Sequence, residues 1–168
     1  MNYFVTWNVD AQHGRGERFK VRQTPEMIAD QMQRQLTYPT YFTEGTYFSL
    51  GVQPLPAGVR FPDELADDDP EQMRYMQAAG SNRALTIEAR VPGPDGGGGY
   101  THYVLAREPV ADPDRWVPLS WDNGSAEPYT IQLHPEEIFT GQQAVPVFRD
   151  YIINGRLPDP QLLRVIDV

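Results

Sequence analysis

Residues 85–91 alternate apolar and polar side chains so regularly that they constrain the fold more than any other segment. The odd-numbered residues are all apolar, and the even-numbered ones are threonine, glutamate and arginine. A period of two is typical of a strand with one buried face. Residues 100–107 can form its partner. The glycine-rich segment 92–99, with the turn-forming pair Asp95–Gly96, is followed by a strand and not by the helix that a phosphate loop requires, so it predicts a hairpin tip.

Further strand patterns indicate that this hairpin belongs to a larger sheet. The dipeptide Asn123–Gly124 predicts the turn of a second hairpin. In its second arm, Tyr129, Ile131 and Leu133 alternate with polar residues, and we expect these three side chains to face inward. Because adjacent arms of a hairpin run in opposite directions, we expect a largely antiparallel sheet. The expected strands are residues 3–9, 46–52, 85–91, 100–107, 116–122, 127–133 and 162–168.

Two segments carry the start signals and the apolar stripe of amphipathic helices. Residues 25–37 follow Thr24, which can cap a helix, and begin with Pro25, which suits the first helical position. Residues 141–154 follow a capping box that starts at Thr140, but Pro146 predicts either a kink or a later start. We also expect a short helix at residues 71–79, which carries Met73 and Met76, and a loop around Gly14 and Gly16.

Length and composition predict one α+β domain spanning residues 1–168, with a mostly antiparallel sheet and both main helices packed on one face. A chain of 168 residues that is 40% hydrophobic can bury a sizeable core without disulfides or a structural metal. No apolar run is long enough to cross a bilayer, and the first residues lack the basic segment of a signal peptide. The absence of cysteine favours a cytoplasmic location.

The same composition argues against most chemistry. Without cysteine there is no thiol nucleophile or iron–sulfur site, and His13, His102 and His134 show no metal-binding spacing. His134-Pro135-Glu136 matches the first half of a zinc-deaminase signature, but its Cys-containing half is missing. We therefore expect no enzyme, no metal and no cofactor. A formal net charge of -9 argues against direct nucleic-acid binding and favours a basic partner.

The last third of the chain resembles a known family. Tyr129 to Ile138 and Ala144 to Pro158 are similar to the end of a bacterial immunity-protein family that accompanies polymorphic toxins, many of them nucleic-acid deaminases. Phe148, Gly155 and Pro158 lie where that family places a helical phenylalanine, a glycine and a proline. The resemblance implies an α+β scaffold that binds and inhibits a cognate toxin domain by occluding its active site.

An acidic run supplies the first candidate for the surface that binds such a partner. Charge runs of this kind are either solvated loops or recognition surfaces, and six carboxylates within nine residues could mimic phosphate in a basic cleft. Our first choice is the acidic segment formed by Asp63, Glu64, Asp67, Asp68, Asp69 and Glu71.

A second candidate surface surrounds the Asn123–Gly124 turn. It comprises Trp121, Asp122, Glu127 and Tyr129, because aromatic side chains on a hairpin either join the core or anchor interfaces. Two other functions stay open, a small-molecule-binding module that uses the sheet face and an enzyme with an unrecognised site. The sequence leaves the oligomeric state undetermined.

Overall fold

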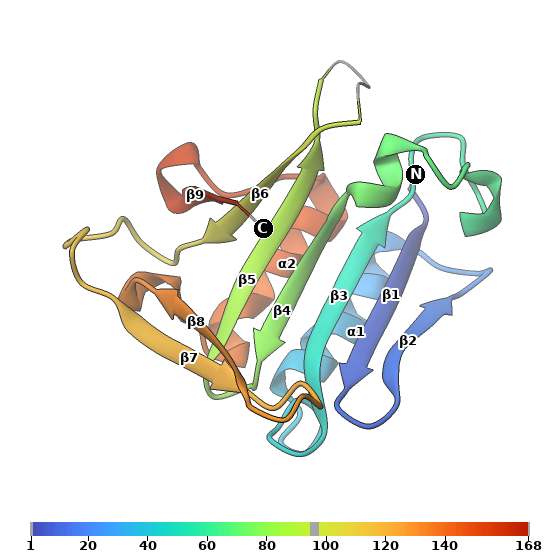
Figure 1. The fold of residues 1–168 in the computed structure, drawn as a ribbon. Coiled ribbons are helices and arrows are strands. Elements are labelled where there is room, and N and C mark those ends of the chain that lie inside the picture. The colour runs from blue at the N-terminus through green and yellow to red at the C-terminus, as the bar shows by residue number, and fades with distance from the viewer. Residues whose placement is uncertain (1, 95–97, 168) are drawn as a thin grey trace.

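A computed structural model describes residues 2–94 and 98–167, and it has two layers, an antiparallel sheet and a pair of helices (Figure 1). The seven-stranded sheet has the order β2-β1-β3-β4-β5-β6-β9, and β7 and β8 form a separate two-stranded sheet. The strands are β1 (Phe4–Asp10), β2 (Gly14–Phe19), β3 (Tyr47–Pro54), β4 (Tyr75–Gly80), β5 (Leu85–Pro92), β6 (Tyr100–Leu105), β7 (Val117–Trp121), β8 (Tyr129–Leu133) and β9 (Leu163–Ile166). The predicted α+β class is confirmed.

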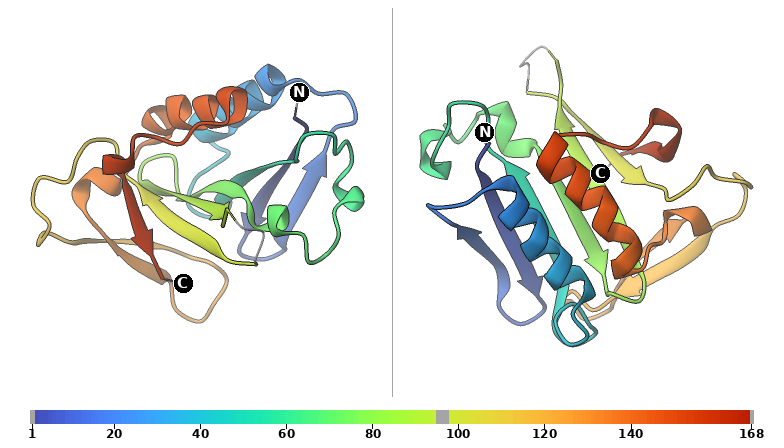
Figure 2. Two further views of the ribbon diagram at one scale, coloured as in Figure 1. Left: turned by 90° about the horizontal axis from the view of Figure 1, so that it is seen from above. Right: turned by 180° about the vertical axis from the view of Figure 1, so that it is seen from behind.

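Both main helices cover the same face of the sheet, as predicted (Figure 2). Helix α1 (Pro25–Thr37) begins where Thr24 accepts a hydrogen bond from the Met27 N–H. Helix α2 (Gly141–Asn154) begins with the predicted capping box and ends at Gly155, whose φ of 65° is left-handed. Pro146 lies inside α2, so the helix does not start late.

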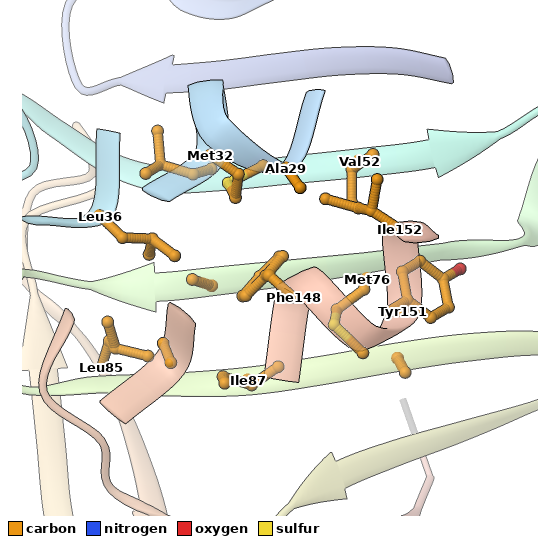
Figure 3. Close-up of a cluster of buried hydrophobic side chains, with 14 of the residues drawn as sticks. Ala29, Met32, Leu36, Val52, Met76, Leu85, Ile87, Phe148, Tyr151 and Ile152 are labelled. Atoms are coloured by element: carbon orange, nitrogen blue, oxygen red, sulfur yellow. The ribbon is translucent and has the colours of Figure 1, made fainter. Parts of the chain in front are cut away.

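The main core lies between these helices and the central strands (Figure 3). It forms because alternate residues of β3, β4 and β5 face the helices while the helices turn their apolar stripes inward. In the antiparallel register, Val52 of β3 lies opposite Met76 of β4, which lies opposite Ala89 of β5. Side chains from both helices complete the cluster, among them Ala29, Met32, Leu36, Phe148, Tyr151 and Ile152.

The opposite face of the sheet is covered by long polar and aromatic side chains. Trp7 lies flat across Gly51 of β3, where an added Cβ would be 2.1 Å from the indole ring. The Trp7 ring contacts the edge of Tyr75 at 5.7 Å between centroids, and the Arg15 guanidinium stacks 4.1 Å above it. These contacts leave Trp7 only 4% exposed without a second layer of helices.

Two segments flank that face. The β7–β8 hairpin packs Leu119 and Leu133 against Val104 of β6. At the other side, the connection from β3 to β4 packs Leu65 against Val5 of β1. This connection contains two short 3₁₀ helices, η1 (Pro62–Glu64) and η2 (Pro70–Met73).

Two more 3₁₀ helices, η3 (Pro135–Glu137) and η4 (Pro160–Leu162), precede α2 and β9, respectively.

Two predicted elements are wrong. The helix expected at 71–79 is the end of η2 followed by strand β4, because Met76 and Ala78 alternate into the core. The loop expected around Gly14 and Gly16 is strand β2, which pairs along β1 from Val5↔Phe19 to Asp10↔Gly14. The predicted Asp95–Gly96 turn lies outside the described residues.

Within the described ranges, neither main helix has the length and apolar character required to cross a bilayer.

Candidate partner-binding groove

The acidic segment divides into exposed and structural carboxylates. Asp69 accepts a hydrogen bond from the Glu71 N–H at the start of η2, and Glu71 forms a two-point ion pair with Arg74 at 2.6 and 3.0 Å. The remaining four carboxylates lie on the surface: Asp63, Glu64, Asp67 and Asp68. Glu64 also accepts a bond from the Arg60 N–H, so three of the six side chains contribute to holding the connection in shape.

The residues of the second candidate surface lie at the turn end of the β7–β8 hairpin. Trp121 and Tyr129 face each other across the two strands, with ring centroids 5.0 Å apart. Trp121 is half-buried against the Val104 cluster, whereas Tyr129 is 47% exposed, contrary to the inward orientation expected from its alternation. Asp122 and Glu127 are exposed on the connecting turn. These four residues are therefore brought together as one surface.

The hairpin tip also closes one side of a groove of about 1010 Å³. Gly124, with a φ of 87°, lies so close to the β1–β2 turn that an added Cβ would be 2.3 Å from the Ala11 carbonyl oxygen. The turn between β4 and β5 and the loop before β3 complete the walls. Chain segments far apart in sequence thus meet at this end of the sheet, near the lower edge of Figure 1.

The groove has an apolar floor and an acidic rim. Trp121, Leu119 and Tyr47 provide aromatic and aliphatic surface, and Asp10, Glu44 and Asp122 provide three carboxylates; these are named here as the groove carboxylates. Among the described residues that line it, His13 is the only basic side chain, and there is no lysine or arginine. A cleft with one sign of charge concentrates ligands of the opposite sign.

Local hydrogen bonds hold two of the groove carboxylates in place. Asp10 Oδ1 accepts from the backbone N–H groups of His13 at 2.7 Å and Gln12 at 2.8 Å. The His13 N–H bond is the main reason that the pKa of the Asp10 carboxyl is lowered from its ordinary value, so the group stays ionised. Asp122 Oδ1 accepts from the Gly124 N–H at 2.8 Å, which leaves its second oxygen for a partner.

The structure does not bring the two predicted surfaces together. The acidic segment follows the last residue of β3, whereas the groove adjoins the first residues of that strand. Sequence reasoning identified Trp121 and Asp122 but missed Asp10 and Glu44. Asp10 carried a usable local signal, because an aspartate ahead of a short polar turn often accepts backbone bonds two and three residues later. Nothing local to Glu44 indicated that it would border the same groove.

The histidines occupy separate places. His13 is exposed beside Asp10, His102 is buried with Nε2 3.1 Å from Glu88, and His134 is buried with Nδ1 2.8 Å from the Arg115 carbonyl oxygen. In the part of the chain that the structure describes, no three histidine or carboxylate side chains converge as metal ligands would.

Comparisons of the chain with protein-family models, with curated proteins and with solved structures give no match.

Proposed function

We propose that this protein is an immunity protein that binds a cognate polymorphic toxin domain, of the nucleic-acid-targeting deaminase type, and occludes its active site. The observation that supports this best is the groove with an acidic rim, an aromatic floor, and neither lysine nor arginine among its described lining residues. A toxin that handles nucleic acid needs basic side chains to neutralise phosphates, and such side chains complement the groove carboxylates.

The shape of the groove favours a protein partner that inserts a loop or side chains. Arginine suits both parts of the site, since its guanidinium can stack on Trp121 while donating to a carboxylate. A toxin arginine held in this way would be withdrawn from its substrate. The overall charge of -9 adds long-range attraction to a basic partner and speeds association.

The resemblance of residues 129–138 and 144–158 to a family of immunity proteins supports the same class of partner. Tyr129, the first of these residues, pairs with Trp121, which lines the groove. The acidic segment is an alternative docking surface at the other end of β3. Both surfaces have exposed carboxylates, so the test must compare them directly.

A pair of charge-matched variants separates the surfaces. The groove variant carries Asp10→Asn, Glu44→Gln and Asp122→Asn, and the control carries Asp63→Asn, Asp67→Asn and Asp68→Asn. Each removes three negative charges, and neither touches Asp69 or Glu71, which stabilise η2. Each variant is co-expressed with the toxin domain encoded beside its gene, and growth rescue and the association rate at low and physiological salt are measured.

We expect the groove variant to lose rescue, to associate at least about tenfold more slowly at low salt and to show a flatter salt dependence. The control should change much less. The reverse pattern would move the interface to the acidic segment. If the parent protein neither rescues growth nor co-purifies with the toxin domain, the immunity function is excluded for that partner.

A further inference from the structure

A second cavity lies at the opposite end of the sheet from the groove. It measures about 420 Å³ and opens between the end of α2, the first residues of β1 and the two ends of the β3–β4 connection. Because β1 runs from Phe4 at this cavity to Asp10 at the groove, the sites are roughly 20 Å apart along the strand. The cavity is therefore independent of the proposed partner surface.

Apolar and polar groups contribute about equally to the walls. Phe4, Leu55 and Ile152 are among the apolar side chains, together with the rings of three prolines. The polar groups include the Glu71–Arg74 ion pair and Tyr151. A cavity of this size that combines apolar side chains with convergent polar groups is suited to a small molecule.

Tyr151 is the feature that points to a ligand. The side chain is 6% exposed, and its hydroxyl has no hydrogen-bond partner among the described residues. Figure 3 shows this hydroxyl at the rim of the core cluster, turned away from Phe148. A buried hydroxyl without a partner destabilises the fold, and a ligand oxygen that accepts its hydrogen bond would offset that cost. Burial raises the pKa of Tyr151, so the hydroxyl remains a proton donor at neutral pH.

The other polar groups restrict the charge of the ligand. Glu71 and Arg74 bind each other through both oxygens and two nitrogens, so together they offer no net charge. The last turn of α2, residues 151–155, also borders the cavity, and the C-terminal end of a helix favours hydrogen-bond donors. We infer that this cavity binds a small uncharged molecule with an apolar body and an amide or similar group whose oxygen accepts from Tyr151.

Four single-ring probes of similar size test the inference on the full chain. Benzamide has the required neutral amide, toluene lacks polar atoms, benzoate is an anion and benzylamine is a cation. Binding is followed by NMR through the backbone amides of Leu55, Arg74 and Gly155, with the Ala11 and Asp122 amides as a control for the groove. We expect saturable shifts at the three cavity amides with benzamide, and weaker binding of the other three probes.

Tyr151→Phe should weaken benzamide binding about fivefold, because one hydrogen bond is lost, while leaving toluene binding unchanged. Tyr38→Phe is the control, since Tyr38 is exposed beyond the end of α1. If Tyr151→Phe does not fold, the order of the affinities of the four probes for the parent chain still tests the inference. The inference is overturned if benzamide gives no saturable cavity shifts, binds no better than toluene or the charged probes, or binds Tyr151→Phe as tightly as the parent. Rescue from the toxin is a separate readout, so either proposal can fail alone.

Discussion

Arg164 of the last strand binds Glu137 of turn η3 through two parallel hydrogen bonds, Nε to Oε1 at 2.6 Å and Nη2 to Oε2 at 2.9 Å. Glu137 is 1% exposed and also accepts a bond from the His134 N–H at 2.8 Å. The pair thus joins β9 to turn η3, which lies between β8 and α2. The two paired residues are 27 positions apart in the sequence.

We expect Glu137→Gln to lower the free energy of unfolding by about 3 kcal/mol, because it leaves a partly buried arginine without its counter-charge. Denaturant unfolding followed by circular dichroism measures the change. Glu108→Gln is the matched control, since its contact with Arg107 is 4.0 Å long and exposed, and it should cost less than about 1 kcal/mol. Equal effects of the two substitutions would show that the buried pair has no special role.

Gly51→Ala should destabilise the sheet by about 1–3 kcal/mol, because the new methyl group would overlap the Trp7 ring and displace it. The loss should accompany a change in tryptophan fluorescence as the indole becomes more exposed. Gly99→Ala is a suitable control, since an added Cβ there meets no atom within 4 Å. An unchanged melting temperature and spectrum in Gly51→Ala would contradict the close packing.

Pro146→Ala should stabilise the protein by about 2 kcal/mol. The proline lies inside α2 and cannot donate a helical hydrogen bond, so its replacement by alanine allows one more bond in the helix. The alanine variant also has a more flexible unfolded chain, but this loss offsets only part of the added stability. Thermal unfolding of this variant is compared with that of Gln142→Ala, an exposed position on the same helix. A fall in melting temperature for Pro146→Ala would mean that the helix depends on the proline.

Asp10 should titrate at a pH below the ordinary range of an aspartate, as measured by carboxyl ¹³C NMR. Its folded pKa is lowered, so the stability that it contributes is present above the unfolded pKa and is lost as the pH falls through the folded value. In His13→Ala the backbone N–H donor remains, and we expect the Asp10 pKa to stay low. A return to the ordinary value in that variant would assign the effect to the imidazole ring.

The sequence predicted those elements whose signals are local. Thr24 and Thr140 cap the helices at the expected residues, and the alternation of residues 85–91 identified a central strand. Strand β4 was misread because Met73 and Met76 have the spacing of a helix, and only pairing with β3 and β5 reveals that Met76 alternates with Ala78. Such pairing depends on contacts that a local pattern does not contain.

The groove illustrates the same limit for the candidate site. Asp122 could be chosen because it adjoins a hairpin turn, but Asp10 and Glu44 join it only through the order of the strands and the close approach of Gly124 to Ala11. The Tyr151 cavity was equally hidden, since its tyrosine follows the same helical stripe as the core residues Phe148 and Ile152.

The outermost strands of the sheet have a consequence for behaviour at high concentration. β9 has only four residues. In β2, the charged residues Arg15, Glu17 and Arg18 are all exposed. A short strand offers few backbone groups to a neighbour, and charged side chains oppose the flat apolar contact that fibrils require. Both borders of the seven-stranded sheet therefore oppose strand-by-strand polymerisation at high protein concentration.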